Sequence, residues 1–198
     1  MKKISIASCI LLLLVLLGTS ASAQDNMKKA NKDKEPAFDV GDKTLGVSVG
    51  FGANYSYNYY AGYAPVVLPA IAVTYDQGIM EAGPGTIGVG GIIGAQFSHY
   101  GYLGSNIRYT NYIIGARGTW HLTLLKDKNN KFDPYGGAMV GLRFFNYSNN
   151  YNNITSTSVS PALALFVGAK YNFSKHVGAF AEVGFDISLL RFGLNFNF

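Results

Sequence analysis

The sequence is poor in charge and has a single cysteine. Asp, Glu, Lys and Arg make up 14% of its 198 residues, whereas an ordinary soluble domain carries about 25%. A chain with so few charges is predicted to place much of its surface against something less polar than water. Cys9 has no partner for a disulfide, and the three histidines show no spacing typical of a metal site. We therefore predict no disulfide, no metal and no other cofactor.

Hydrophobic runs long enough for a membrane-spanning helix, about 20 residues, are also missing. The longest apolar run, residues 10–17, follows Lys2 and Lys3 and precedes the small residues Ala21-Ser22-Ala23. This order of basic, apolar and small residues is typical of a secretory signal peptide. We predict that residues 1–23 are cleaved after export across the inner membrane, and that Cys9 is removed with them.

Residues 24–43 contain little that a protein core could bury. They hold five lysines and five acidic residues around Pro36. A near-neutral segment of this kind is most simply a solvated chain, so we predict a disordered periplasmic tail. The formal net charge of the whole chain is only +5, and its basic residues are not gathered in one stretch. Both observations argue against a nucleic-acid partner.

The rest of the chain is rich in glycine and aromatic residues and alternates with the period of a β-strand. Ile113, Met139 and Phe166 are apolar exceptions on the otherwise polar face. Eight alternating segments cover residues 45–53, 70–76, 87–98, 111–122, 135–144, 163–173, 177–187 and 190–198. Proline supports this division, because it is best tolerated near the start of a strand. Pro69, Pro84, Pro134 and Pro161 all fall there, and none is predicted to interrupt a strand centre.

The predicted connections differ in length at the two ends of the strands. Tyr-, Asn- and Ser-rich loops are predicted at residues 55–66, 99–109 and 145–158. The turns at 77–83 and 172–176 are shorter, and the charged segment 123–133 is a long exception. Long loops at one end and tight turns at the other are typical of an outer-membrane barrel.

The polar face of the strands favours a barrel over a soluble sandwich. It consists mainly of Gly, Ala and Ser with single charges in most strands, which suits the crowded interior of a small barrel, where charges must pair. We predict an all-β, transmembrane, eight-stranded antiparallel up-and-down barrel over residues 44–198. Its lumen is predicted to hold a charge network made of Asp76, Arg117, Arg143, Lys170, Glu182, Asp186 and Arg191. Such charges can form a proton or ion path or a structural filling, and we favour the filling because eight strands leave room only for side chains.

Aromatic residues are predicted to form a girdle at each lipid boundary. At the long-loop rim these are Tyr55, Tyr57, Tyr59, Tyr100, Tyr102, Tyr109, Phe144 and Tyr147. At the opposite rim they are Tyr75, Trp120, Phe173, Phe196 and Phe198.

The last eight residues carry the most specific motif. Arg191 is followed by Gly193 and by aromatic residues at the third-last and last positions, Phe196 and Phe198. This run resembles the C-terminal assembly signal of outer-membrane proteins, and residues 44–198 resemble the OmpA-like and OmpX-like small barrels. The resemblance implies a Gram-negative outer membrane, surrounding lipid, and recognition of the last strand by the barrel-assembly machinery, with Phe198 the most sensitive residue. The family is functionally diverse, so the fold implies no single function.

Three functions are compatible with these features. A monomeric structural or surface-interaction barrel, presenting Tyr- and Asn-rich loops to an extracellular ligand, fits all of them and is our interpretation. A narrow, porin-like pore would need a continuous wetted path. A lipid-modifying envelope enzyme would need a nucleophile and a base, for which only Ser98 and His99 are candidates. Adjacent strand residues point to opposite faces, so we predict no catalytic residue.

Overall fold

The chain is described here by a computed structural model covering residues 37–53, 66–102, 105–122, 131–149 and 154–198. The predicted signal peptide, most of the predicted tail, and Tyr55, Tyr57 and Tyr59 lie outside the described residues. The side chains of Tyr100 and Tyr102 lie outside them as well. No helix among the described residues is long and apolar enough to cross a membrane.

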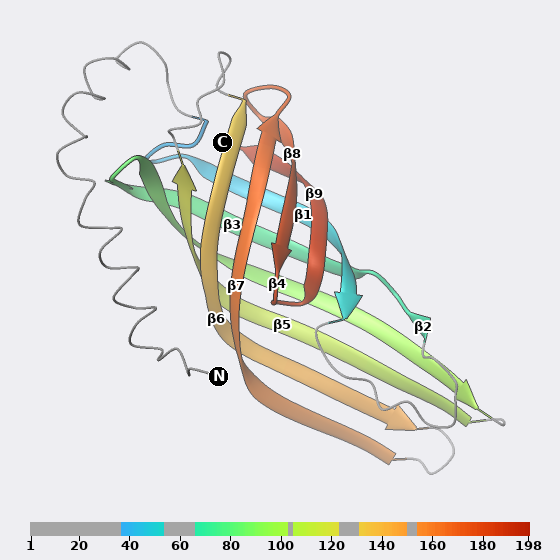
Figure 1. Cartoon of the computed structure of the whole chain (residues 1–198). Coiled ribbons are helices and arrows are strands. Elements are labelled where there is room, and N and C mark those ends of the chain that lie inside the picture. The colour runs from blue at the N-terminus through green and yellow to red at the C-terminus, as the bar shows by residue number, and fades with distance from the viewer. Residues whose placement is uncertain (1–36, 54–65, 103–104, 123–130, 150–153) are drawn as a thin grey trace, which may run out of the picture.

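Eight antiparallel strands close into a barrel, and a ninth, β2, adds a short ribbon at one rim (Figure 1). In chain order the strands are β1 (Lys43–Ala53), β2 (Val66–Val67), β3 (Ala70–Ala82), β4 (Gly85–Tyr102), β5 (Ser105–Leu122), β6 (Phe132–Asn149), β7 (Ile154–Asn172), β8 (Val177–Gly184) and β9 (Ser188–Asn197). Consecutive long strands pair with each other, and β2 pairs with β4 alone. The predicted eight-stranded up-and-down barrel is confirmed.

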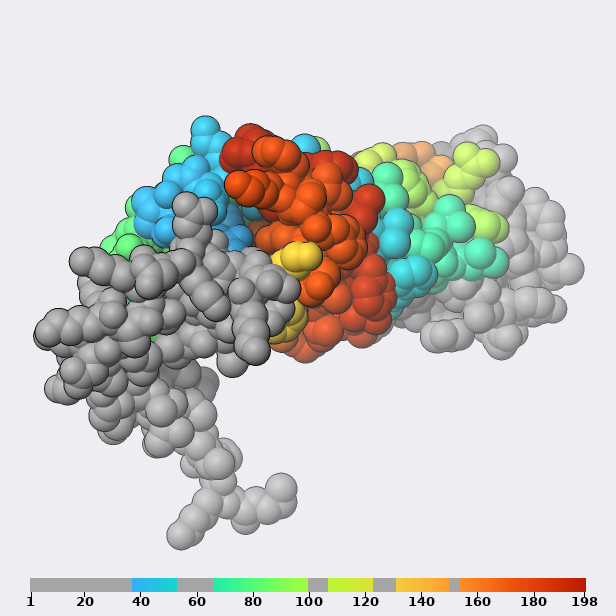
Figure 2. All heavy atoms as spheres, turned by 90° about the horizontal axis from the view of Figure 1, so that it is seen from above, coloured from blue at the N-terminus to red at the C-terminus, as the bar shows by residue number. Residues whose placement is uncertain are grey.

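The barrel closes where the first strand meets the last. β1 pairs with β9 from Thr44↔Asn197 to Ala53↔Ser188. Beyond the last ladder pair, the amide of Phe198 donates to the carbonyl of Lys43 at 3.0 Å, and the Lys43 amide donates back at 3.2 Å. In Figure 2 the red and orange spheres of the last strands lie against the blue and cyan residues of the first. The ladder is interrupted only at Gly52, whose φ is 81°.

Strands β4 to β7 are much longer than the sequence predicts. They contain 18 or 19 residues each, whereas β8 has 8, β9 has 10 and β1 has 11. The predicted loops at 99–109 and 145–158 are therefore wrong: pairing continues through Tyr102↔Ser105 and Asn149↔Ile154. Polar Tyr, Asn, Ser and Thr side chains suit a sheet wetted on both faces, and they do not by themselves end a strand. Beyond the barrel rim these four strands form a projecting sheet, made of residues 97–102, 105–110, 144–149 and 154–160 (Figure 1).

Pro161 lies inside β7, opposite Leu142, so the prediction that no proline interrupts a strand is wrong. The reason is that β7 has only one neighbour at this point, because its pairing with β8 begins at Phe166↔Gly184. The carbonyl of Leu165 accepts a bond from Phe185 on the β8 side. Backbone groups of odd-numbered residues in β7 therefore point away from β6. The nitrogen of Pro161 faces an open edge, where no hydrogen is required.

The turns are tighter than predicted. β3 continues to Ala82, and the chain reverses at Gly83, whose φ of 59° suits glycine, and Pro84. β8 ends at Gly184, so residues 185–187 form a turn instead of strand. Within it the Asp186 carboxylate accepts from the amide of Ile187 at 2.6 Å. The chain bends inward there, and Ile187, predicted to face outward, is completely buried.

The barrel is apolar outside and polar inside, the reverse of a soluble protein. Large apolar side chains are most exposed on the outer face, such as Leu163 at 77% and Ile93 at 59%. This outer belt is suited to lipid. The three exceptions to the alternation face the lumen, where they are buried: Ile113, Met139 and Phe166.

The aromatic girdles follow the prediction at one rim only. At the end of the barrel that holds the turns 83–84 and 173–176, here called the turn end, Trp120, Phe173, Phe196 and Phe198 are exposed on the outside. At the opposite loop end, Tyr109 and Tyr147 lie on strand positions that face inward, with ring centroids 5.4 Å apart. Their place in the girdle was wrong. The predicted Phe144 does lie on an outward strand position, opposite Tyr112. Tyr112 also makes an edge-to-face contact with Phe97 at 6.2 Å.

Gly90 tests the close approach of β3 and β4. A Cβ at this inward position would overlap the carbonyl oxygen of Tyr75 and come within 2.9 Å of the Asp76 Cα. We expect Gly90→Val to lower the free energy of unfolding by about 1–3 kcal/mol. Gly118→Val is the matched control, since its Cβ would meet nothing within 4 Å, and we expect a change within about 0.5 kcal/mol. Urea unfolding in lipid vesicles, followed by Trp120 fluorescence, measures both; equal effects would contradict the assigned packing.

Candidate functional site in the barrel lumen

Six of the seven predicted lumen charges meet inside the barrel. Five of them lie on inward-facing positions of five strands, and Asp186 lies in the β8–β9 turn. All six are between 1% and 4% exposed. We call them the charge cluster: Asp76, Arg117, Lys170, Glu182, Asp186 and Arg191.

Glu182 is the centre of the charge cluster. Its carboxylate accepts from the Arg117 guanidinium, with Nη2 2.8 Å from Oε2 and Nη1 3.4 Å from Oε1. The guanidinium of Arg191, its cross-strand partner on β9, bonds to the same carboxylate. The Tyr135 hydroxyl donates to Oε2 at 3.0 Å. One carboxylate thus holds two buried cations and a phenol, and this number of partners offsets the cost of removing the charges from water.

Asp186 links the charge cluster to the loop end. Its Oδ2 lies 2.8 Å from Nη2 of Arg191. Arg143, the seventh predicted residue, lies beside the cluster: its Nη2 donates to the backbone carbonyl of Asp186 at 2.7 Å. Arg143 is only half-buried, because it lies near the loop-end opening of the lumen.

Asp76 lies on the other side of Arg117. Its Oδ1 is 3.9 Å from Nε of Arg117 and its Oδ2 is 3.9 Å from Nζ of Lys170. These are ion-pair distances, too long for direct hydrogen bonds. The Lys170 ammonium also lies 4.9 Å from the centroid of the Phe38 ring and 5.3 Å from that of Tyr135. Cation–π attraction therefore adds to its pairing with Asp76.

The structure adds a buried pair that the sequence analysis missed, His121 and Asp133. Nδ1 of His121 lies 2.8 Å from Oδ2 of Asp133, and Nε2 lies 3.1 Å from the Thr119 hydroxyl. We had placed Asp133 in a loop, but β6 begins at Phe132. The signal that identifies it is strand parity, because Asp133 is two residues before Tyr135 on the inward face. With Asp133 included, the charged lumen residues are four acids and four Lys or Arg.

The arrangement of Asp133, His121 and Thr119 has the connectivity of a nucleophile, a base and an orienting group. His121 is 0% exposed, however, and Thr119 is 3% exposed. The Phe38 ring covers one side of the imidazole at 3.9 Å and Tyr135 lies at 5.2 Å. A substrate carbonyl has no approach to the hydroxyl in this packing. Ser98 and His99 diverge, as adjacent strand residues must: Ser98 is buried and His99 is exposed.

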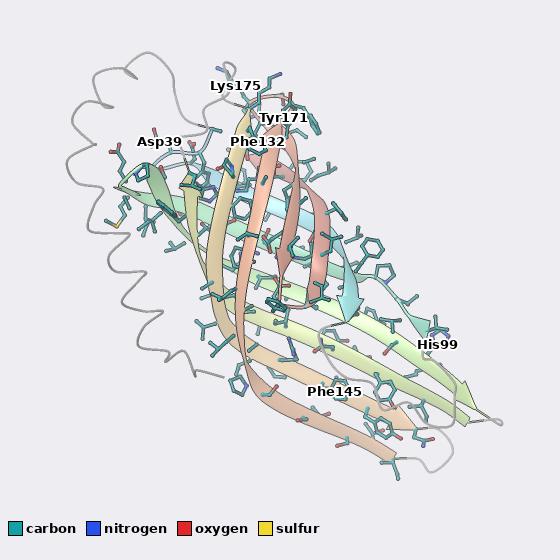
Figure 3. All side chains as sticks on the ribbon, in the orientation of Figure 1. Asp39, His99, Phe132, Phe145, Tyr171 and Lys175 are labelled. Atoms are coloured by element: carbon teal, nitrogen blue, oxygen red, sulfur yellow. The ribbon has the colours of Figure 1, made fainter. Side chains whose placement is uncertain are left out.

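A segment from the predicted tail closes the turn end of the lumen. Residues 37–42 lie against β3, with the amide of Gly41 donating to the carbonyl of Gly78 and the amide of Gly78 donating to the carbonyl of Asp42, each at 3.0 Å. A Cβ on Gly78 would overlap the carbonyl oxygen of Asp39. This contact places Phe38, only 3% exposed, over His121. Asp39 marks the segment in Figure 3.

An apolar layer closes the lumen toward the loop end. Ile187 enters it from the β8–β9 turn, and a Cβ on Gly94 of β4 would be 3.0 Å from its Cδ1. The layer consists of Ala70, Ala72, Ile92, Ile113, Tyr135, Met139, Ala162, Ala164, Phe166 and Ile187. Phe166 joins it to the charge cluster, since the Arg117 guanidinium lies 4.0 Å above its ring. Phe38, the charge cluster and this layer thus follow one another along the lumen.

The residues of the predicted assembly signal divide between the two faces of β9. Arg191 faces the lumen, while Phe196 and Phe198 are 39% and 67% exposed outside. Gly193 makes room for a lumen aromatic that the sequence analysis did not place, since a Cβ there would be 2.6 Å from Cε1 of Phe180. Gly193 therefore has a packing role in the folded barrel. No group of three or more His, Cys, Asp or Glu suited to a metal ion occurs among the residues that the structure describes.

No protein family and no curated protein sequence matches the chain. Its structure is similar to that of Ail, the attachment invasion locus protein of Yersinia pestis, in complex with the heparin analogue sucrose octasulfate: the TM-score is 0.50 and the identity 12%, over 80% of this chain and 99% of that chain. The N-terminal β-barrel domain of Pseudomonas aeruginosa OprF is similar at 13% identity, with a TM-score of 0.48 over 80% of this chain and 98% of that chain. The outer-membrane protein OprG from the same organism matches at 14%, with a TM-score of 0.48 over 83% and 99%.

The OprF domain is described as a β-barrel and OprG as an outer-membrane protein. At such low identity the likeness to Ail establishes the fold alone, and it confirms the predicted barrel architecture. The apolar outer belt of this chain agrees with the predicted outer-membrane location.

Glu182→Gln tests whether the central carboxylate holds the charge cluster together. The amide keeps the shape but leaves Arg117 and Arg191 without their shared counter-charge. We expect a loss of about 3–5 kcal/mol in the free energy of unfolding, as for breaking a buried ion pair. Glu81→Gln removes an exposed carboxylate and is the control, with an expected change within about 0.5 kcal/mol. Urea unfolding in lipid vesicles measures both, and a Glu182→Gln effect no larger than that of the control would contradict the assignment.

Proposed function

We propose that the chain is a non-conducting outer-membrane barrel that presents a rigid sheet to the outside as an interaction surface. The observation that carries this proposal is the unequal strand length. Strands of 8 to 11 residues are enough to complete the ring at β8, β9 and β1, yet β4 to β7 have 18 or 19. The extra residues are not needed to cross the membrane, which takes about 9–11 residues per strand. They carry the strands beyond the barrel rim.

The lumen supports the non-conducting part of the proposal. Four acids and four Lys or Arg neutralise one another within it, and apolar side chains lie at both ends of the charge cluster. Eight strands give an interior just wide enough for side chains to fill. An ion would have to displace Phe38 or Ile187 and break the pairing around Glu182. The charges therefore serve as a structural filling.

The projecting sheet supports the surface role, and its outer edge is the part best suited to a protein partner. Residues 154–160 of β7 are exposed along their whole length and pair on one side only. The odd positions Thr155, Thr157 and Val159 direct their N–H and C=O groups to the open side, the parity fixed by Leu165. Unpaired backbone groups of this kind accept an added strand from another chain. Figure 1 shows this end of β7 at the margin of the sheet.

We expect the refolded barrel to be silent in planar lipid bilayers. Neither the wild type nor Phe38→Ala should produce reproducible unit conductance steps in concentrated KCl, because the charge cluster lies behind Phe38. Steps from the wild type would support a pore and contradict the closed lumen. Conductance steps from Phe38→Ala but not from the wild type would show that the Phe38 ring, and not the charge cluster, blocks ions.

We expect the open edge of β7 to be required for adhesion. Thr157→Pro combined with Val159→Pro removes two outward N–H groups without touching the bonds to β6. We propose that the wild-type barrel makes otherwise non-adherent Gram-negative cells adhere to immobilised extracellular matrix proteins. The double proline variant should abolish this adhesion, and failure of the wild type to adhere to any protein of the panel would contradict the proposed surface role. The control, Thr157→Ala with Val159→Ala, removes the same side chains but keeps the N–H groups and should still adhere. Equal adhesion of both double variants would contradict a role for the edge, provided that heat-modifiable gel mobility shows both barrels folded.

A further inference from the structure

A pair of basic residues lies on the outer face of the barrel just above its lipid-facing belt. His99 on β4 and Arg108 on β5 are cross-strand partners, and both side chains are exposed. His99 is labelled in Figure 3 on the projecting end of the molecule. Val66 of β2 is the other cross-strand neighbour of His99. Neither His99 nor Arg108 has an ion-pair partner among the described residues.

The pair is the last of a row of outward-facing cross-strand pairs on β4 and β5, and the side chains in this row become more polar toward the loop end. Along β4 and β5 the successive cross-strand pairs on the outer face are Ile93↔Ile114, Ala95↔Tyr112, Phe97↔Thr110 and His99↔Arg108. The row thus runs from branched aliphatic residues, through the aromatic contact of Phe97 with Tyr112, to a hydroxyl and then to a cation. An amphiphile with acyl chains and an anionic headgroup has the same order along its length.

The height of Arg108 places it at the lipid headgroups. Trp120, on the same face of β5, marks the turn-end boundary of the belt, and Arg108 lies twelve residues further toward the loop end. This separation is about 40 Å along a strand that rises about 3.3 Å per residue. At a tilt of about 40° it spans roughly 30 Å along the membrane normal. The hydrocarbon core of a bilayer has about this thickness, so the guanidinium reaches the outer headgroup layer.

A groove opens at the same level. It has a volume of about 290 Å³ and is lined by Phe97, His99, Arg108 and Thr110 from the outer face and by Ser98 and Tyr109, whose strand positions face inward. The outer-face residues supply a guanidinium, an imidazole and a hydroxyl beside the Phe97 ring. A guanidinium recognises phosphate oxygens through paired N–H donors, and the lower dielectric at a membrane surface strengthens the interaction.

The charge of this region is also one-sided. Residues 82–126 and 134–181 contain no Asp or Glu. Asp186, in the β8–β9 turn, faces the lumen and pairs with Arg191. Arg108 is therefore not neutralised by a carboxylate on its own face in the described part of the chain, and an external anion can supply the missing charge.

From these observations we infer that the groove around Arg108 and His99 binds the phosphate of a lipid in the outer leaflet, with the acyl chains lying along Ile93, Ile114 and Phe97. The phosphate receives the guanidinium donors of Arg108 and the hydroxyl of Thr110. This site is independent of the open β7 edge and of the proposed adhesion, because it lies on the opposite margin of the projecting sheet, on β4 and β5.

The test measures binding of a diphosphorylated glycolipid, diphosphoryl lipid A, to the folded barrel in a neutral detergent by native mass spectrometry. We expect Arg108→Gln to weaken binding at least tenfold and Arg108→Lys to retain part of it. Lys175→Gln is the matched control, since it removes an exposed positive charge at the turn end (Figure 3). The control should bind as the wild type does, and wild-type binding should weaken with salt.

Two outcomes overturn the inference. Arg108→Gln binding as tightly as Lys175→Gln, with both barrels heat-modifiable, would show that Arg108 does not hold the lipid. Displacement of the lipid by inorganic phosphate at concentrations comparable to that of the lipid would show a site for free anions, without a contribution from the apolar end of the row. A dephosphorylated form of the same glycolipid should bind weakly to the wild type. Its affinity should equal that of the phosphorylated form for Arg108→Gln.

Discussion

Closure of the backbone hydrogen-bond ring is the constraint on which the rest of this structure depends. In hydrocarbon, every N–H and C=O group must find a partner within the protein, and a sheet satisfies this only when its first strand pairs with its last. Here β1 and β9 pair from Thr44↔Asn197 to Ala53↔Ser188, and the bonds between Lys43 and Phe198 extend the pairing beyond the ladder. A closed ring of eight strands fixes a narrow interior. The interior must then be filled by side chains from this ring, and the charges placed there must compensate one another.

Strand parity allowed much of the fold and several of the lumen residues to be located from the sequence. A period of two assigns each side chain to one face, so Glu182 and Arg191 were placed inside by their own strands, and the structure brings them into contact. The exceptions to the alternation were informative as well. Ile113, Met139 and Phe166 departed from the pattern because the interior has an apolar layer of its own.

Features that depend on distant contacts were not predictable in this way. The inward bend at Ile187 is accompanied by a hydrogen bond within the turn. The burial of Phe38 depends on the bonds of its segment to β3 and on the stacking of its ring against His121 of β5. The extent of β4 to β7 was missed because Tyr, Asn and Ser are common in loops, yet they are equally compatible with a sheet that water reaches from both sides. Asp133 was missed for a related reason: a charged loop conceals where the next strand begins.

Phe38 and its segment contact three different strands at the turn end of the barrel. Its ring rests on His121 of β5 and near Lys170 of β7, while its backbone neighbours bond to Gly78 of β3. None of these three strands pairs with another of the three in the sheet. The segment at residues 37–42 therefore ties together strands that share no backbone hydrogen bonds with one another.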